Sequence, residues 1–559
     1  MIRKARSECL FEIVKPKRTF GHDIAVYIGK HRFIKHRTIE QIIKRLSRKY
    51  GITISQGEVS YQSKRFLISL KCLHDLNAEK LLSRIEQQGG YILHIDGTSA
   101  EDSDHLFAAL DGISGFVLLS SRIRSENKKE LVEILNELKE RFGEPLLIIK
   151  DMAQGVENAC REVFPFVAIV ECHFHFCRDV GLELFDPYYS EFRKLMNDLK
   201  LKLDLKRILK GIQSTCKEHG YHLKSILKAI AAGKKDGFDK DALTLALIYD
   251  NVQKTLKNKR DRTGLGLPFD LPLVDLYRNC LVSAPLIRRL LITYAQSDRM
   301  NPLLHRLDTL LKGLSEQPTA TARRLSELNH MIFEVSALFS KLRTILRLRC
   351  NGRTPLSDPL PSSLSEQQAI HKDLTTFKQA LRKELDQVNC PLQREKQIIF
   401  DHLARHLDKL ELPVIEIWDG AGVRVLDLSR TNNLVEQHFR FLKRSGRKRH
   451  GRSDIGLDLN EYGPYLSYVE NLGHDGYLES MFKSWDGLVR AFSSIPDSVY
   501  LTAEVEYDDV LKTPIRPFQL GKGFDYLFSR GLTLLEYQID LEKYGGGSMY
   551  RPMVSPTDV

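Results

Sequence analysis

The sequence has few of the features that mark secreted or membrane proteins. Its 559 residues include 9 cysteines, an odd number scattered along the chain, and this excludes the dense disulfide framework of small secreted domains. No run approaches the roughly 20 apolar residues that span a bilayer. The basic first residues, 1–18, carry an apolar stretch that Glu12 interrupts, which is too short for a signal-peptide core. We therefore expect a soluble protein of a reducing, cytoplasmic compartment with no membrane association.

The excess of positive charge is small for the length of the chain. Lys and Arg number 84 against 72 Asp and Glu, and the formal net charge of +12 favours a polyanionic partner such as nucleic acid or an anionic membrane surface. Hydrophobic residues make up 42% of the sequence and exclude disorder as the global state. The length is several times that of a common domain of about 150 residues, so we expect several domains or a large insertion.

Residues 37–75 are expected to form two helices around a short connection. Apolar residues from Ile39 to Leu46 share one face of the first helix, which ends at Gly51. Ser55 is a suitable N-cap for the second helix. The pattern is typical of a helix-turn-helix that lays its second helix in a DNA groove, and a generic helical hairpin with a solvated face is the alternative. The residues expected to contact DNA from the second helix are Ser60, Gln62, Lys64 and Arg65.

From residue 91 the apolar pattern changes from helical to strand-like. Three short apolar runs predict three antiparallel strands. Two later apolar runs, each of which follows a predicted helix, predict a fourth and a fifth strand. The expected elements are strands at 91–98, 107–110 and 115–120, a helix at 128–141, a strand at 146–151, a helix at 153–163 and a strand at 167–172.

Strand patterns are absent between residues 180 and 410. Long Leu- and Lys-rich amphipathic segments there predict an all-helical block with a Pro/Ser-rich break at 351–363. Strand character returns at 413–418, and residues 429–433 open a helix that is expected to extend to Lys443. A mixed C-terminal region follows.

Two aspartates, Asp96 and Asp151, stand where an apolar strand ends. Rigid carboxylates held together at one edge of a sheet suit Mg²⁺ or Mn²⁺, which prefer oxygen ligands. For either residue alone, an aspartate that caps a turn is the simpler explanation. The order of elements favours the metal site. Three antiparallel strands, helix, strand, helix and strand, with carboxylates on the first and fourth strands, is the order of the ribonuclease-H-like fold.

The strings around these aspartates have counterparts in a known class of enzymes. Residues 94–98 (HIDGT), 149–153 (IKDMA) and 431–436 (TNNLVE) resemble the Asp-Asp-Glu blocks of cut-and-paste DNA transposases, and Cys172–His175 resembles the Cys-x-x-His motif of that group. The resemblance is to the Mutator-like and related bacterial insertion-sequence transposases, in which a long helical insertion precedes the Glu. It implies an α/β protein whose ribonuclease-H-like mixed sheet is split by a long all-α insertion, with an N-terminal helix-turn-helix domain.

The resemblance implies that Asp96, Asp151 and Glu436 are catalytic carboxylates that bind two Mg²⁺ or Mn²⁺ ions. In two-metal phosphoryl transfer, ions about 3.5–4 Å apart activate the attacking oxygen and stabilise the leaving one, so several carboxylates must converge. Water first frees a 3′-hydroxyl at the end of the mobile element, and this hydroxyl then attacks target DNA. The residues implied to support the active site are Cys172, His175 and Asn433.

The helix that carries Glu436 points to a polyanion by itself. Glu436, Arg440 and Lys443 are spaced to share one helical face, which suits a DNA backbone lying across a metal site. Basic residues continue beyond Lys443 with no acid between them. Such closely spaced like charges repel one another unless phosphate groups neutralise them. Gly446 and Gly451 indicate a mobile basic loop, for which a solvated surface or a nuclear-localisation string is the alternative. The residues expected to bind DNA here are Arg440, Lys443, Arg444, Arg447, Lys448 and Arg449.

Several residues near these motifs admit a second role. The Cys and His residues of 172–177 invite a zinc site, but structural zinc sites draw ligands from two separated pairs, and a second pair at recognisable spacing is missing. A simple core role is a further alternative for Cys172 and His175. Glu171, Asp102 and Asp104 compete for the metal role, although a turn is the simpler explanation for them.

We predict a DNA transposase that binds the ends of a mobile element and catalyses metal-dependent strand cleavage and strand transfer. The alternatives are a catalytically silent, transposase-derived DNA-binding protein and a ribonuclease-H-like nuclease that does not join strands. The expected partners are double-stranded DNA, as terminal inverted repeats and target, and further copies of the chain in a homodimer or larger assembly. The expected setting is a prokaryotic cytoplasm, at the nucleoid when bound to DNA. The predicted divisions are a helix-turn-helix domain at 1–88, a first catalytic part at 89–180, the insertion at 181–410, a second catalytic part with the Glu helix and basic loop at 411–475, and a C-terminal region and tail at 476–559.

Overall fold

The computed structural model describes most of the chain before residue 513. The Pro/Ser-rich break up to residue 362 and the tail expected at the C-terminus lie outside the described residues. The described residues are 14, 18–99, 104–234, 237–257, 265–294, 300–315, 319–348, 363–418, 422–451 and 455–512.

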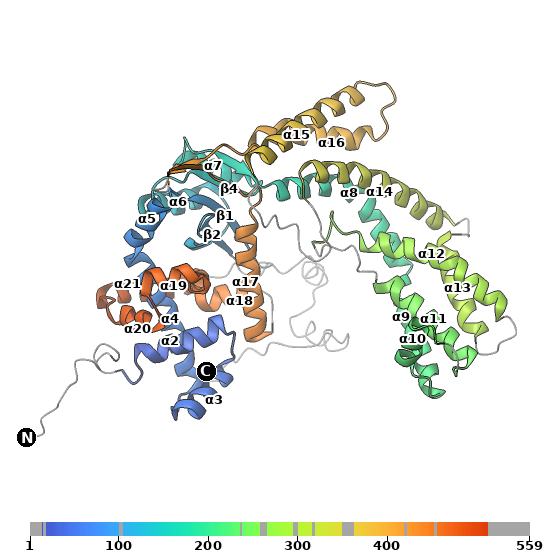
Figure 1. Cartoon of the computed structure of the whole chain (residues 1–559), viewed down its shortest axis with the longest axis horizontal. Coiled ribbons are helices and arrows are strands. Elements are labelled where there is room, and N and C mark those ends of the chain that lie inside the picture. The colour runs from blue at the N-terminus through green and yellow to red at the C-terminus, as the bar shows by residue number, and fades with distance from the viewer. Residues whose placement is uncertain are drawn as a thin grey trace, which may run out of the picture.

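A five-stranded mixed sheet forms the centre of one lobe (Figure 1). Its strand order is β3-β2-β1-β4-β5; β2 pairs antiparallel with both β1 and β3, and β4 runs parallel to both β1 and β5. The sequence prediction of all five strands is confirmed, because the short apolar runs of the parallel strands are buried and those of the hairpins end at turn residues. The strands are β1 (Ile92–Thr98), β2 (His105–Asp111), β3 (Val117–Ile123), β4 (Leu147–Lys150) and β5 (Ile169–Glu171).

Alternate residues of the strands face two different sets of neighbours. In β4, Ile148 points into the main core with the helices that follow β3 and β4, whereas Leu147 and Ile149 pack against the segment around Ile417 and Leu428. Both faces of the parallel strands are therefore covered, which explains their continuous apolar runs. The covering elements are α6 (Lys128–Phe142), α7 (Gln154–Val163) and the two-stranded ribbon β6 (Glu416–Trp418) with β7 (Val423–Val425).

The N-terminal helices begin and end where local signals place them. The Thr38 side chain accepts a hydrogen bond from Gln41 N–H in a capping box, and Gly51 closes the same helix with φ of +67°. The Ser55 hydroxyl accepts the Glu58 N–H at 3.1 Å and starts the next helix. These helices are α2 (His22–Gly29), η1 (Lys30–Ile34), α3 (Ile39–Tyr50), α4 (Gln56–Leu76) and α5 (Ala78–Gln87).

The second half of α4 enters the same hydrophobic core as the sheet. Phe66 and Leu67 are fully buried in a cluster that also contains the strands and the C-terminal helices. The expectation that the polar side chains of this helix face outward is wrong for Gln62, Ser63 and Arg65, which tertiary contacts bury. The described part of the C-terminal region, expected to be mixed, consists of α18 (Ile455–Tyr462), η3 (Gly463–Gly473), α19 (Asp475–Phe482), α20 (Trp485–Ser493) and α21 (Asp497–Lys512).

A helical block between β5 and β6 forms a second lobe with its own core (Figure 1). This stretch is helical as the amphipathic pattern predicts, and its buried leucines and phenylalanines form a cluster separate from that of the sheet. The helices are α8 (His173–Asp198), α9 (Leu201–Glu218), α10 (Leu223–Ala231), α11 (Lys240–Lys257), α12 (Pro272–Thr293), α13 (Asn301–Ser315), α14 (Ala320–Ile345), α15 (Leu364–Leu385), α16 (Gln393–His406) and η2 (Leu407–Lys409).

The helix α17 (Asn433–His450) brings the chain back to the sheet and is longer than its sequence indicates. The basic stretch expected as a mobile loop is helical up to His450, and Gly451 ends it with φ of +80°. Gly446 serves close packing instead of flexibility, because a Cβ atom there would lie 2.5 Å from Asp458 Oδ2. The prediction of a loop was wrong because Gly446 packs against Asp458 of α18, and the local sequence does not reveal this contact.

Candidate active site

Three carboxylates from distant parts of the sequence line one cavity of about 750 Å³. Asp96 comes from β1, Asp151 follows β4 directly, and Glu436 lies in the first turn of α17. The structure thus brings together the three residues that the sequence placed in the catalytic role. The other lining residues are Gly97, Thr98, Met152, His175, Arg178, Asp179, Phe439, Arg440, Lys443, Arg444 and Arg447.

The register of the parallel strands places the two aspartates side by side. His94 in β1 pairs with Ile149 in β4, and each aspartate stands two residues further along its chain. Because both strands run in the same direction, their carboxyl ends meet at one edge of the sheet. The Asp96 Oδ1 accepts the Gly97 N–H at 2.8 Å, and the Asp151 Oδ1 accepts the Ala153 N–H at 2.9 Å.

The electrostatics of the cavity reflect this proximity. Burial and then the charge of Asp151 raise the pKa of Asp96 to about 8, although His175 acts in the opposite direction. Burial favours the neutral form of Glu436, but the hydrogen bond and charge of His175, together with Arg440, outweigh it and lower the pKa of Glu436. The anion of Glu436 is therefore stabilised, whereas burial and the neighbouring Asp151 disfavour the anion of Asp96.

His175 links the carboxylates to the start of α8. Its Nε2 lies 3.3 Å from Glu436 Oε1. Burial works against protonation of this ring, yet Cys172, Glu436 and Asp96 around it raise the pKa of His175 well above the usual range. The groups around the His175 ring therefore favour its protonated form, which faces Glu436.

The N-terminus of α17 is held to β1 by Asn432, a residue that sequence reasoning missed. Its buried side-chain amide donates to the Ile95 carbonyl at 2.8 Å, and its Oδ1 lies 3.1 Å from His94 Nδ1. The Asn432 backbone N–H lies 3.1 Å from Cys172 Sγ, so the buried thiol accepts a hydrogen bond at the same junction. Asn433, the neighbour that the sequence indicated, is half-buried in the first turn.

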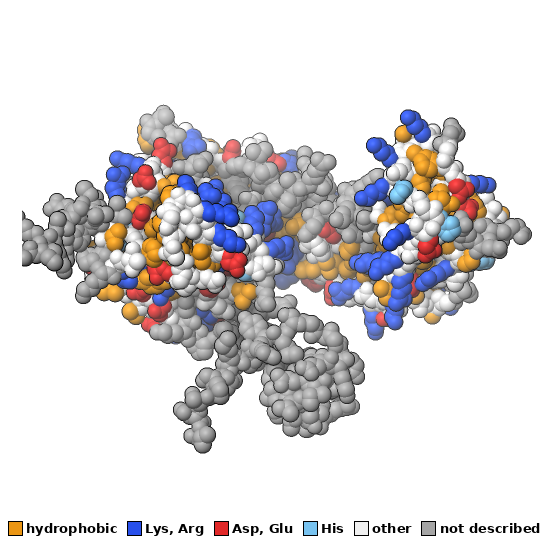
Figure 2. All heavy atoms as spheres, turned by 90° about the horizontal axis from the view of Figure 1, so that it is seen from below, with side chains coloured by type: hydrophobic (Ala, Val, Ile, Leu, Met, Phe, Trp, Pro, Cys, Tyr) orange, Lys and Arg blue, Asp and Glu red, His pale blue; other side chains and the backbone are white. Residues whose placement is uncertain are grey.

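Cations from α8 and α17 line the cavity beside the carboxylates. Lys443 Nζ lies 2.9 Å from Thr98 Oγ1, which holds that lysine over the end of β1. Arg444 and Arg447 line the cavity, and Lys448 follows them on the exposed part of the helix. Figure 2 shows Lys and Arg side chains gathered on the sides of the two lobes that face each other.

One basic residue of α17 does not reach the surface. Arg449, which was expected to bind DNA, is 5% exposed, and its Nη2 lies 2.7 Å from Asp458 Oδ1. The helix turns this side chain toward α18, because its position lies on the face opposite the cavity. The prediction that Arg449 contacts DNA is therefore corrected, because tertiary packing buries this side chain.

The residues expected to read DNA from α4 have different environments. Ser60 is exposed, but Gln62 and Arg65 are 1% and 6% exposed and are hydrogen bonded to each other at 3.0 Å. Lys64 Nζ lies 2.6 Å from Asp508 of α21. In this structure Gln62 and Arg65 are thus turned inward, and the assignment of α4 to a DNA groove stays a prediction.

Further charged residues near the cavity were missed from the sequence. Glu126 lies so close to β1 that a Cβ atom on Gly97 would approach its Oε1 to 2.2 Å, and burial and the charge of Asp151 raise the pKa of Glu126. Arg178 and Asp179 line the cavity from α8. No spacing signal pointed to them, since Glu126 stands in a loop and the other two in a helix outside the motif blocks.

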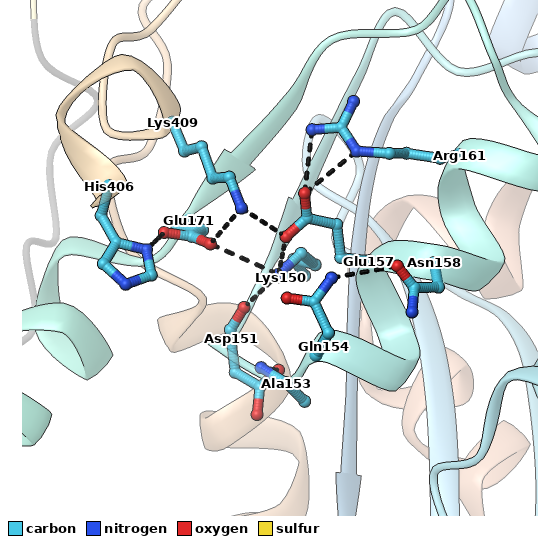
Figure 3. Close-up of polar contacts among 10 residues, drawn as sticks. All are labelled: Lys150, Asp151, Ala153, Gln154, Glu157, Asn158, Arg161, Glu171, His406 and Lys409. Atoms are coloured by element: carbon cyan, nitrogen blue, oxygen red, sulfur yellow. Dashed lines mark hydrogen bonds and ion pairs between the residues drawn. The ribbon is translucent and has the colours of Figure 1, made fainter. Parts of the chain in front are cut away.

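The competing carboxylates are engaged elsewhere. Asp104 pairs with Arg122 at 2.7 Å, both nearly buried, and Asp102 lies outside the described residues. Glu171 is buried, and its Oε2 lies 2.7 Å from His406 Nδ1 in a network behind β4 (Figure 3).

The donor set matches the chemistry of Mg²⁺ or Mn²⁺, which take carboxylate oxygens. Asp96 and Asp151 share one edge of the sheet, and Glu436 faces the same cavity. Across the described residues no group of three His, Cys, Asp or Glu side chains is arranged to hold a metal ion, and Glu436 is engaged by His175. His173 does not support the zinc alternative, because its Nε2 lies 2.8 Å from the Leu410 carbonyl oxygen.

Comparison with known proteins gave no match, either to a protein-family profile or to a curated sequence. Among the helices of the described residues, none has the length and apolar character needed to cross a membrane.

Proposed function

We propose that the protein is a DNA transposase of the Asp-Asp-Glu type, with Asp96, Asp151 and Glu436 as the carboxylates that bind two Mg²⁺ or Mn²⁺ ions. The observation that carries the proposal is that these three residues, from three separate elements, line one cavity together with a row of cations. The strand order β3-β2-β1-β4-β5 and the helical block between β5 and α17 support a ribonuclease-H-like domain split by an insertion.

The chain's own residues have separable roles in this chemistry. Bound divalent ions supply activation of the attacking oxygen and stabilisation of the leaving oxygen. Asp96 and Asp151 present oxygen donors from a rigid sheet edge, so little reorganisation is required on binding. Arg440, Lys443 and Arg444 bind the phosphodiester backbone through its charge. No covalent protein nucleophile is required, since water and then a DNA 3′-hydroxyl attack the phosphorus.

The resemblance of the motif blocks extends the proposal to its partners. Double-stranded DNA is bound as the terminal inverted repeats of an element and as target, and the chain acts as a homodimer or a larger assembly on DNA. The N-terminal helices α2 to α4 form a small apolar cluster of their own around Ile42 and Leu46 and would serve to find the element's ends.

The proposal is tested with a plasmid that carries the gene and its flanking DNA. Asp96→Ala, Asp151→Ala and Glu436→Ala are each expected to abolish Mg²⁺-dependent cleavage while duplex binding in a gel-shift assay persists. Glu162→Ala, an exposed acid paired with Lys128, serves as the control and keeps full cleavage. Cleavage without joined products identifies a nuclease, binding without cleavage by the unaltered protein identifies the silent alternative, and full cleavage by Glu436→Ala moves the third role to another carboxylate.

A further inference from the structure

A buried network of charged side chains lies behind the strand that leads to Asp151 (Figure 3). The Lys150 side chain, at the end of β4, is 0% exposed. Its Nζ lies 3.7 Å from Glu157 Oε2 in α7 and 3.8 Å from Glu171 Oε1 in β5. The same ammonium donates to the Asp151 carbonyl oxygen at 2.8 Å. A fully buried charge therefore makes a direct contact with the residue that follows it.

The end of the helical block supplies the second cation of this network. Lys409 Nζ lies 2.7 Å from Glu157 Oε2 and 3.5 Å from Glu171 Oε1, so it shares both carboxylates with Lys150. His406, at the end of α16, bonds the other oxygen of Glu171 at 2.7 Å. Burial opposes ionisation of Glu157, but Lys409, Arg161 and Lys150 together lower its pKa. Lys150, Glu157 and Glu171 are thus buried together, and the partly exposed Lys409 contacts both carboxylates from the edge of the network.

Stability alone does not account for such an arrangement. The free energy lost when buried ion pairs leave water offsets much of the attraction between their charges. Apolar residues of similar volume therefore often stabilise a protein equally well. What an apolar residue cannot do is donate to the Asp151 carbonyl. Asp151 is held at both ends, because Lys150 fixes its carbonyl oxygen and the Ala153 N–H fixes its carboxylate. Groups that orient a metal ligand from behind determine how well it binds.

We propose that Lys150 is a positioning residue for Asp151, held in place by Glu157 and Glu171, and that Lys409 and His406 make this support depend on the docked end of the helical block. The inference rests on the proposed function, because it takes Asp151 as a ligand of the catalytic ions. It assigns a role to a residue that touches neither DNA nor the ions.

The test compares variants that remove the contact of Lys150 with Asp151, with and without a compensating loss of buried charge, and a variant that keeps a donor. Lys150→Met removes the donor, and Lys150→Met/Glu171→Gln removes one cation and one anion together, so no uncompensated charge stays buried. Lys150→Arg keeps a donor and a charge. Lys128→Met is the matched control, since Lys128 Nζ lies 2.5 Å from Glu162 Oε2 in an exposed pair outside this network. Each full-length variant is first checked for folding by thermal unfolding.

Three measurements are made on the folded variants. Both Lys150→Met variants are expected to lower kcat for Mg²⁺-dependent DNA cleavage by about 10- to 100-fold with KM for DNA unchanged, and to weaken Mn²⁺ binding measured by calorimetry. Hydrogen exchange at the Ala153 amide is expected to accelerate, because Asp151 is no longer held. Lys150→Arg restores part of each property, and Lys128→Met matches the unaltered protein.

The outcomes separate this inference from the proposed function. Unchanged kcat, Mn²⁺ binding and Ala153 exchange in a folded Lys150→Met variant overturn the inference, and Lys150 is then structural. If the unaltered protein neither cleaves DNA nor binds Mn²⁺, the proposed function fails, while Ala153 exchange still reports on the support of Asp151. If both Lys150→Met variants fail to fold, Lys409→Met replaces them; a lower kcat with unchanged KM supports the inference, and an unchanged kcat overturns it.

Discussion

At the scale of single residues, buried polar side chains decide how the site is assembled. Asn432 is 0% exposed and joins α17 to β1, whose Ile95 lies 337 positions earlier in the chain. Its side-chain amide donates to the Ile95 carbonyl, and its Oδ1 meets the buried His94 ring. A buried polar group without a partner is costly, so the geometry of this junction is strongly specified.

We expect Asn432→Ala to lower the free energy of unfolding by about 1–3 kcal/mol, because it removes the side-chain partner of the buried Ile95 carbonyl. Chemical denaturation measures the change. DNA cleavage is also expected to fall, since Glu436 is carried by the helix that Asn432 holds. Asn433→Ala, at a half-buried neighbour, is the control for stability. Equal losses of stability in the two variants would contradict the role given to Asn432.

Asp75 is expected to make stability depend on acid pH. Burial raises the pKa of Asp75, but Lys71 and Arg141 outweigh it and hold the pKa below its ordinary value of 3.8. A carboxyl whose pKa is lowered by folding stabilises the protein above its unfolded pKa and loses that contribution as pH falls through the folded pKa. Asp75→Asn is therefore expected to destabilise the protein at pH 7 and to converge with the unaltered protein in thermal unfolding as the pH falls below 3.8 through the folded pKa. A constant difference across this range would be the contrary result.

At the scale of elements, the two faces of α17 have different surroundings. Glu436, Arg440 and Lys443 face the cavity, and Leu442 and Arg449 face the core and α18. The Arg449–Asp458 pair has side chains 0% and 2% exposed, so it fixes the rotation of the helix from inside. The direction in which Glu436 points therefore depends on a contact made near the other end of the helix.

We expect Asp458→Asn to lower the free energy of unfolding by about 3–5 kcal/mol, since it leaves the Arg449 charge buried without its counter-charge. Denaturant unfolding measures the loss. Asp508→Asn is the matched control, because its pair with Lys64 is partly exposed and is worth about 0–1 kcal/mol. A loss for Asp458→Asn no larger than that of the control would refute the role of this pair in holding α17.

At the scale of the whole molecule, the described residues form two main hydrophobic clusters. One cluster unites the sheet with α4 and the C-terminal helices, and the other belongs to the helical block. The N-terminal helices are thus tied to the sheet by Phe66 and Leu67, whereas the region around Ile42 and Leu46 forms a small satellite cluster. Contacts across the sequence, and not its linear order, define the folding units.

We expect a chain shortened to residues 89–559 to lose cooperative unfolding, because the sheet loses the buried side chains that α4 contributes. Circular dichroism during heating measures cooperativity, and binding of an apolar dye measures the exposed core. A shortened chain that melts in one sharp transition near the temperature of the full chain would show that residues 89–559 fold without residues 1–88 and would contradict this prediction.

The sequence by itself determined where most of the described helices and strands lie, except for the end of α17 and for β7, and where the two aspartates stand. Periodicity, the caps at Ser55 and Gly51, and short apolar runs depend on backbone hydrogen bonding within an element, so they are readable locally. The position of Asp96 and Asp151 at strand ends follows from the same pattern, and parallel pairing then places them side by side.

Only the tertiary structure decided which polar residues face inward and which residues contact and orient those of the candidate site. Gln62 and Arg449 carry the same local signals as exposed residues, yet they are buried because α4 meets the C-terminal helices and α17 meets Asp458. The choice of Asn432 over its neighbour, and the contact of Lys409 with the Glu157 that also pairs with Lys150, depend on residues hundreds of positions apart. Charge and polarity along a chain set what a side chain is able to bind, whereas its partner is set by the packing of elements that the linear pattern does not encode.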